Sequence, residues 1–214
     1  MNMEIKICGL TKVEEAAYLN ENNVNYAGFV FFEKSKRNVT LEKAKEIAGH
    51  LSKDIKKVAV LVSPDAALIE KLQEADVFDV LQVHKELTVE VLEAARIPVW
   101  YAFNIADPAQ IEEKQHFLQE LTGELSKKIE ALVVDGAEYG SGKTFDWSKQ
   151  IAQTEELFLN RRFVLAGGLH ADNVKQGINI FHPDVVDVSS GVEGEAGKDE
   201  EKVRAFVLAA RAKV

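Results

Sequence analysis

The sequence predicts an α/β fold in which eight parallel strands alternate with helices and close into a (β/α)8 TIM barrel. Eight short apolar segments recur along the 214 residues, and segments of helical character separate them. The apolar segments are continuous runs rather than apolar and polar alternations, which is typical of parallel strands covered by helices on both faces. Eight such units fit a barrel at the short end of its usual length. We expect a single domain over residues 1–214, with a doubly wound open sheet as the alternative.

The expected strands are short runs rich in β-branched and aromatic residues. In chain order they cover residues 5–8, 26–32, 57–62, 79–84, 98–103, 131–135, 163–167 and 184–190. The expected helices cover residues 11–22, 40–51, 65–75, 88–96, 107–121, 146–157, 171–178 and 198–213. Thr40, Asp65 and Asp107 are expected N-caps, and a further helix is expected to start near Asp199. Residues 122–129 are expected to form a loop or to continue the fifth helix.

Net charge, cysteine count and histidine spacing argue against several classes of protein. The formal net charge of −9 opposes binding to nucleic acid, which favours a basic surface. Cys8 is the only cysteine, so that an intrachain disulfide and a cysteine-rich zinc site are excluded. Five histidines lack the spacing of a metal site, and we expect no metal. No segment reads as a signal peptide or membrane span, so a cytoplasmic protein is expected.

The segment "ALVVDGAEYGSGKTFDW", residues 131–147, is similar to a nucleotide-binding P-loop. In the strict pattern a glycine stands five residues before Gly142, but that position is Ala137. The Lys-Thr pair should also run directly into a helix, whereas Asp146 suggests an N-cap two residues later. A P-loop nucleotide-binding protein therefore remains only as an alternative.

Two candidate acid–base groups stand at strand ends, where barrels carry their active sites. Cys8 ends the first strand, and its thiolate could act as a base if positive charge from Lys6 or Arg37 lowered its pKa. Asp135 ends the sixth strand at an apolar rim that could raise its pKa and make it a general acid. A buried structural thiol and a turn-forming Asp-Gly pair are the plain alternatives.

Further strand ends suggest binding groups. Arg37 follows the second strand and can bind a carboxylate through two parallel hydrogen bonds, although a solvated surface charge is the alternative. After the seventh and eighth strands stand Gly167, Gly168, Ser190 and Gly191, where small residues let backbone N–H groups approach a phosphate. Tight turns alone would also explain these glycines. His84 is expected to be a structural histidine.

Six motifs, in this order, resemble the phosphoribosylanthranilate isomerase family: "KICGLT", "GFVFFEKSKR", "LQVH", "VVDG" with "GSGKTFDW", "LAGGLHADNV" and "DVSSGVEGEAGKD". The resemblance runs from Lys6 to about Asp199, in register with all eight expected strands. It implies a single-domain barrel that needs no cofactor and converts N-(5-phosphoribosyl)anthranilate into 1-(2-carboxyphenylamino)-1-deoxyribulose 5-phosphate, an Amadori rearrangement of tryptophan biosynthesis.

The same resemblance implies the roles of single residues. Cys8 would be the general base and Asp135 the general acid, and Arg37 would bind the anthranilate carboxylate. The phosphate of this small-molecule substrate would be held by Gly167, Gly168, Ser190 and Gly191, and "GSGKT" would be a loop rather than a nucleotide cradle. Family members occur as monomers and as dimers.

Some positions depart from the family pattern, and other enzymes remain as alternatives. Lys85 stands where a glycine is common, Lys36 where a proline is, and Gly136 where a slightly larger residue is. Another phosphate-binding barrel, such as indole-glycerol-phosphate synthase or a sugar-phosphate epimerase, would need a lysine or a metal-binding histidine set at the strand ends. The sequence shows neither.

Overall fold

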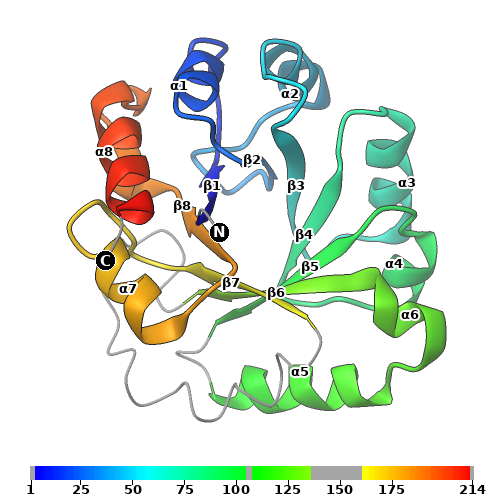
Figure 1. Ribbon diagram of the computed structural model, residues 1–214. Helices are drawn as coiled ribbons and strands as arrows, with labels where there is room; N and C mark the ends of the chain where they lie inside the picture. Colours follow the sequence, from blue (N-terminus) through cyan, green and yellow to red (C-terminus); the bar gives the residue numbers. More distant parts are fainter. Residues whose placement is uncertain (1–2, 105–107, 136–160, 213–214) are drawn as a thin grey trace.

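A computed structural model of the chain describes residues 3–104, 108–135 and 161–212. Eight parallel strands form a closed barrel in chain order, and helices surround them in a ring (Figure 1). The prediction of a (β/α)8 barrel is confirmed, and the open-sheet alternative is wrong. The strands are β1 (Glu4–Cys8), β2 (Tyr26–Phe31), β3 (Lys56–Val62), β4 (Val80–His84), β5 (Val99–Asn104), β6 (Ile129–Asp135), β7 (Arg162–Ala166) and β8 (Val185–Val188).

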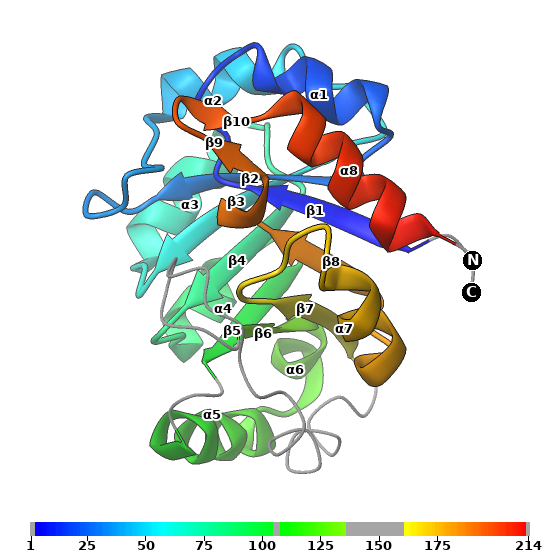
Figure 2. The ribbon, with the colours of Figure 1, turned by 90° about the vertical axis from the view of Figure 1, so that its left-hand side faces the viewer.

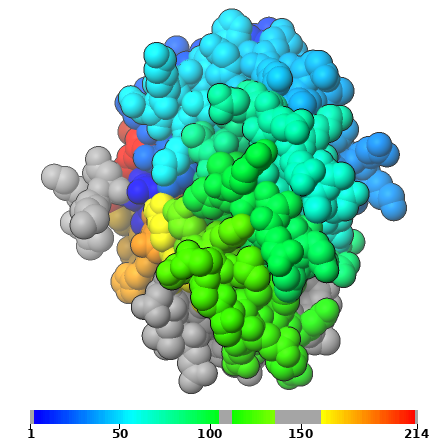
Figure 3. Space-filling model, turned by 90° about the vertical axis from the view of Figure 1, so that its right-hand side faces the viewer, coloured from blue at the N-terminus to red at the C-terminus, as the bar shows by residue number. Residues whose placement is uncertain are grey.

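The helices are α1 (Glu15–Glu21), α2 (Leu41–Ala48), α3 (Ala66–Glu74), α4 (Val89–Ala94), α5 (Pro108–Glu120), α6 (Gly123–Lys128), α7 (Val174–Phe181) and α8 (Glu200–Arg211). Thr40, Asp65 and Asp199 cap α2, α3 and α8 by accepting hydrogen bonds from the first turn, as predicted. Asp107 and the helix predicted over 146–157 lie outside the described residues. Figure 3 shows one side of the helical layer, where the cyan and green segments form a continuous surface.

The prediction for residues 122–129 was wrong. A separate short helix, α6, occupies Gly123–Lys128, and β6 begins at Ile129. Gly123 has a left-handed φ of +59°, which glycine adopts without strain, and this turn separates α6 from α5. Leu125 on α6 then packs against the core, which gives the segment a reason to be helical.

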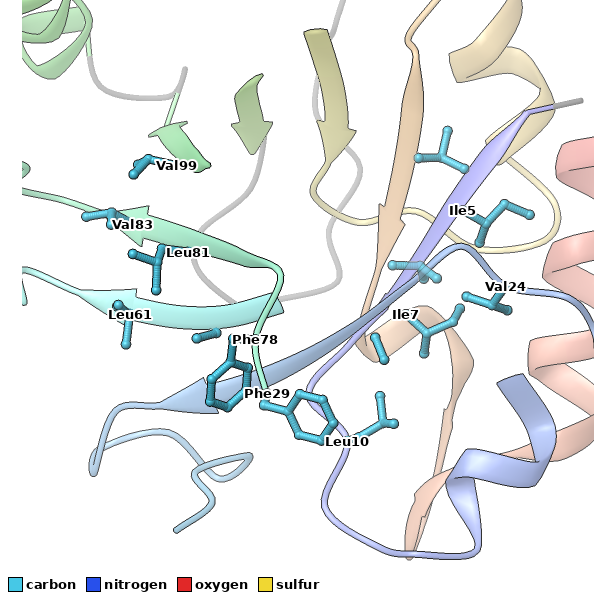
Figure 4. Packing of buried hydrophobic residues seen from close by; sticks show 14 of the residues in the cluster. Ile5, Ile7, Leu10, Val24, Phe29, Leu61, Phe78, Leu81, Val83 and Val99 are labelled. Atoms are coloured by element: carbon cyan, nitrogen blue, oxygen red, sulfur yellow. The ribbon is translucent and has the colours of Figure 1, made fainter. Parts of the chain in front are cut away.

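Side chains alternate between two apolar layers along each strand. One layer fills the barrel and includes Tyr26, Trp100, Val133 and Val164. The other lies between strands and helices, and Figure 4 shows part of it, with Phe29 beside Phe78. The alternation directs Lys6 and Cys8 of β1 toward the barrel axis.

A hairpin follows β8 and completes the carboxyl end of the barrel. A 3₁₀ turn (Ser190–Val192) leads into β9 (Glu193–Gly194), which pairs with β10 (Gly197–Lys198) in antiparallel register. Figure 2 shows this hairpin at the end toward which the strand arrows point, close to α1 and α2. The hairpin therefore lies at the end where a barrel carries its active site.

Candidate active site

A cavity of about 340 Å³ opens at the carboxyl ends of the strands. Its walls contain residues from β1 to β4 and β6 to β8 and from the loops that follow several of them. The sequence-predicted residues that line it are Cys8, Arg37, His84, Asp135, Gly167, Gly168 and Ser190. Gly191 does not line the cavity.

Cys8 ends β1 beside a buried ion pair. The Lys6 ammonium, which is fully buried, donates a 2.8 Å hydrogen bond to Oδ2 of Asp187 on β8. A Cβ atom added to Gly28 on β2 would lie 2.8 Å from the Cys8 sulfur and 3.1 Å from the Lys6 nitrogen. Glycine at position 28 is thus required for the thiol and the ammonium to lie side by side.

The pKa of Cys8 does not meet the condition under which the sequence would make the thiolate a base. Burial raises the pKa of the thiol above its ordinary value, and the Asp187 carboxylate adds to this effect. Lys6 and Lys198 act in the opposite direction and offset these effects only in part. Cys8 is therefore a neutral thiol at neutral pH, and a base at this position needs further positive charge beside it.

Asp135 is the last residue of β6 and lines the same cavity as Cys8. Its neighbours in strand register are Asn104 at the end of β5 and Ala166 at the end of β7. The apolar side chains of Val133 and Ala166 also line the cavity. The carboxyl group consequently stands at an apolar rim, as the sequence predicted.

Arg37 follows β2 and belongs to an ion-pair network rather than to bulk solvent. Its Nε and Nη2 donate to the two carboxylate oxygens of Glu193, at 2.5 and 2.9 Å. Its alkyl chain lies over Gly9, where a Cβ would come within 2.4 Å of the Arg37 Cδ. Gly9 has a φ of +81°, so it combines a left-handed turn with close approach of the arginine.

The loop after β7 lines the cavity with two glycines, so its backbone is not covered by side chains there. Gly167 and Gly168 both have left-handed φ angles, +87° and +63°, which favour glycine. The Asn173 amide donates to the Gly168 carbonyl at 2.9 Å, and its oxygen accepts from the His170 N–H at 2.8 Å. This side chain fixes the loop shape.

Gly191 packs against the backbone of the loop after β7. A Cβ at position 191 would lie 1.9 Å from the Leu169 carbonyl oxygen, so the loops after β7 and β8 can touch only at a glycine. Ser190, its neighbour, reaches the cavity wall. The two loops are brought together as predicted, but Gly191 enters as a packing residue.

His84 ends β4 and is held as a neutral side chain. Burial, together with the positive charges of Lys6 and Lys114, lowers the pKa of His84 to about 3. Its Nε2 lies 2.8 Å from the amide nitrogen of Gln82. Because the imidazole is uncharged at neutral pH, His84 can hydrogen-bond a ligand in the cavity but cannot neutralise a phosphate.

Metal-ligating side chains do not gather in the described part of the chain: no cluster of three or more histidine, cysteine, aspartate or glutamate residues could hold an ion there. Among the same residues, no helix is long and apolar enough to cross a membrane. The "GSGKT" loop, residues 140–144, and Gly136 lie outside the described residues.

The sequence comparisons identify relatives of this arrangement. A family model described as N-(5′-phosphoribosyl)anthranilate isomerase matches residues 5–209. The chain belongs to this family. It is 34% identical over 214 residues to the N-(5′-phosphoribosyl)anthranilate isomerase of Clostridium acetobutylicum, with 98% of both chains covered. It is 37% identical over 210 residues to that of Thermoanaerobacter sp. strain X514, with 96% of both covered.

Solved structures of the isomerase family share the fold. The phosphoribosyl anthranilate isomerase of Thermotoga maritima superposes with a TM-score of 0.82 at 32% identity, covering 97% of this chain and 98% of that one. A phosphoribosyl anthranilate isomerase in complex with reduced 1-(o-carboxyphenylamino)-1-deoxyribulose 5-phosphate gives 0.80 at 29% identity, with coverage of 97% and 98%. Family membership decides against the P-loop interpretation and against the other barrel enzymes.

Sequence reasoning missed three charged residues at this site: Asp187, Glu193 and Lys198. A signal existed for Asp187, because a carboxylate within the apolar run of β8 must find a buried partner, and Lys6 in β1 was the matching cation. No comparable signal pointed to Glu193. Glu195 stands two residues away in the same hairpin, and composition does not distinguish the two.

Proposed function

We propose that this chain isomerises N-(5′-phosphoribosyl)anthranilate to 1-(o-carboxyphenylamino)-1-deoxyribulose 5-phosphate, with Cys8 as general base and Asp135 as general acid. The single observation that supports these roles is that one cavity holds the thiol, the carboxyl group, Arg37 and the glycine loop after β7. Family membership supports the reaction itself. The reaction belongs to tryptophan biosynthesis.

The chemistry requires one proton donor and one proton acceptor. Asp135 protonates the ring oxygen of the ribose, the bond between that oxygen and C1′ breaks, and an iminium forms at C1′. Cys8 then removes the proton from C2′, which the iminium has made acidic. The resulting enolamine takes up a proton at C1′ and loses one from the 2′-oxygen, which gives the ketone.

The neutral thiol is consistent with this order of events. Burial raises the pKa of Cys8, so a thiolate is disfavoured until positive charge appears beside it. Ring opening creates an iminium next to the carbon that Cys8 must deprotonate, and that charge stabilises the thiolate. Lys6, beside the sulfur, contributes in the same direction. Proton removal would therefore follow ring opening.

Binding groups complete the proposal. Arg37 pairs with the anthranilate carboxylate, and backbone N–H groups of Gly167, Gly168 and the segment at Ser190 hold the phosphate. Gly191 contributes by allowing the two loops to touch. The enzyme works as a monomer or homodimer in the cytoplasm, with neither metal nor cofactor, and binds neither nucleic acid nor membrane.

The first test is turnover of freshly generated phosphoribosylanthranilate, followed by the loss of its fluorescence. We expect Cys8→Ser and Asp135→Asn each to lower kcat at least ~100-fold, the low end of general acid–base contributions. Asp79→Asn is the matched control, since Asp79 precedes β4 at the opposite end of the barrel and accepts from the Lys57 N–H. A folded wild-type protein without turnover would refute the proposed function.

A chemical test addresses Cys8 alone. Because the chain has one cysteine, loss of activity that parallels the labelling of Cys8 by iodoacetamide reports on this thiol. We expect inactivation to be slow at neutral pH, since the thiol is neutral, and to be blocked by the reduced product analogue. Retained activity after stoichiometric labelling of Cys8 would exclude its role as base.

A further inference from the structure

Glu193 is a largely buried carboxylate that the proposed chemistry does not use. It stands on β9, and its side chain is 13% exposed. Oε1 accepts from Arg37 Nε and, at 2.8 Å, from Lys198 Nζ, while Oε2 accepts from Arg37 Nη2. The exposed Lys36 ammonium also lies 3.2 Å from Oε2. Two parallel hydrogen bonds to one guanidinium edge fix both its position and its rotation.

The pairing leaves one edge of Arg37 for a ligand. Nε and Nη2 are engaged by Glu193, whereas Nη1 donates to no residue within 3–104, 108–135 or 161–212. Arg37 lines the cavity, and its alkyl chain rests on Gly9, next to Cys8. The edge formed by Nη1 and Nη2 is therefore the one that can meet a substrate carboxylate.

Lys198 holds Glu193 in turn. Its ammonium, with only 1% of the side chain exposed, donates to the Ser189 carbonyl at 3.1 Å and to the Ser189 hydroxyl at 3.2 Å as well as to Glu193. The Lys198 N–H donates to Glu15 on α1, and register pairs Lys198 with Glu193 across the hairpin. Glu193 is thus anchored to the barrel by a buried lysine.

We propose that Glu193 is a positioning residue that makes the site selective for a substrate with an aromatic carboxylate. It holds Arg37 by one edge so that the other edge is already oriented for a bidentate pair with that carboxylate, which lowers the ordering cost of binding. The inference rests on the proposed function and extends it to a residue outside the acid–base pair. The opposite role, competition with the substrate for Arg37, would make removal of Glu193 tighten binding.

The test compares two substrates in wild type and Glu193→Gln. One is phosphoribosylanthranilate, and the other is N-(5-phosphoribosyl)aniline, which lacks the carboxylate. We expect the variant to raise KM for the first substrate about tenfold, or about 1.4 kcal/mol, with kcat within about threefold. For the second substrate, KM should change less than about twofold, because no carboxylate meets Arg37.

Binding of the reduced product analogue, measured by calorimetry, checks the same effect without catalysis, and its Kd should rise about tenfold in parallel. In the background Arg37→Ala, adding Glu193→Gln should cause no further loss, since the two residues act as one unit. Glu195→Gln is the matched control: it removes the same charge from the same hairpin at an exposed position. Glu193→Asp, which keeps the charge but shortens the side chain, serves if the glutamine variant folds poorly, and we expect the same selective loss.

Several results would overturn the inference. Equal losses on both substrates would mean a purely structural role, and unchanged or tighter binding of the analogue would mean that Glu193 does not orient Arg37. An active wild type with an unaffected Glu193→Gln variant refutes this inference and leaves the proposed function intact. A wild type that neither turns over nor binds the analogue refutes both.

Discussion

The two ends of the barrel use charged side chains in different ways. At the amino end, Arg162 donates to the Tyr26 hydroxyl and to Glu4, both at 2.7 Å, and Tyr26 donates to Glu4 at 2.8 Å. At the carboxyl end, Asp187 lines the cavity and accepts from Lys6 through Oδ2, while its buried Oδ1 accepts from no described residue. The first network is closed, and the second leaves a carboxylate oxygen of the site without a partner among the described residues.

This difference separates stability from binding. Groups that satisfy one another contribute to folding and offer nothing to a substrate. Groups held in place with unsatisfied atoms cost stability, and they are oriented before the substrate arrives. Substitutions at the amino end should therefore change the free energy of unfolding alone, whereas substitutions at the carboxyl end should change the free energy of unfolding and also KM or kcat.

The largest expected effect lies at the carboxyl end, in the pair Lys6 and Asp187. Lys6→Met leaves a buried carboxylate without its cation and should lower the free energy of unfolding by about 3–5 kcal/mol, measured with urea. The double variant Lys6→Met, Asp187→Leu should recover most of that loss, because no unpaired charge remains. A single variant as stable as wild type would show that the ion pair does not matter for folding.

The next largest effect is the loss of folding stability at acidic pH that Glu193 causes. Burial alone would raise the pKa of Glu193, but hydrogen bonds from Arg37 and Lys198 outweigh it and lower the pKa from 4.5 to about 2. The folded state thus gains stability above pH 4.5 that is lost as the pH falls toward 2. Glu193→Gln should cost about 2 kcal/mol at neutral pH, and its difference from wild type should vanish on acidification.

At the amino end, Arg162→Met should lower the free energy of unfolding by about 1–2 kcal/mol and leave kcat and KM unchanged. The cost is moderate because Glu4 and Arg162 are partly exposed and solvent screens their charges. Denaturation with urea and steady-state kinetics on the same sample separate the two effects. A changed KM would contradict the division between the two ends of the barrel.

The smallest effect is the loss of folding stability at alkaline pH that Tyr26 causes. Burial and the hydrogen bond to Glu4 raise the pKa of Tyr26 from 10 to about 12. Because the folded pKa is raised, this contribution is complete below pH 10 and is lost as the pH rises toward 12. Tyr26→Phe should cost about 1 kcal/mol at neutral pH. Ultraviolet titration should show a late-ionising tyrosine in wild type that is lost in the Tyr26→Phe variant.

The strands, the helix starts and the grouping of side chains at the carboxyl end could all be predicted from the sequence. Apolar runs located all eight strands, because strands covered on both faces must be apolar throughout, and cap residues located three helix starts. Cys8, Asp135 and Arg37 line one cavity, and sequence could bring them together because strand ends at the carboxyl side of a barrel converge. The grouping of side chains at one end is thus a consequence of topology that sequence can reveal.

The remaining features depend on contacts distant in sequence. Glu193 pairs with Arg37 across 156 positions, and only the hairpin register decides that Glu193 rather than Glu195 faces inward. The sequence left the direction of the Cys8 pKa shift open, because the effect of burial outweighs that of the nearby lysines and the extent of burial is set by the packed barrel. Helix α6 begins at Gly123, which adopts a left-handed φ, and the hydrophobic pattern of the sequence did not single out this glycine.

The ion pair between Lys6 and Asp187 also sets an order of events during synthesis of the chain. The two residues are 181 positions apart, so at typical translation rates Lys6 is added to the chain roughly 10–40 s before its partner. Until β8 pairs with β1, the Lys6 ammonium has no carboxylate partner, and burying it would cost free energy. The first strand therefore cannot take its place in the barrel. Closure of the barrel and assembly of the surroundings of Cys8 are therefore one event, and in a nascent chain stalled before position 187 the candidate active site is not yet formed.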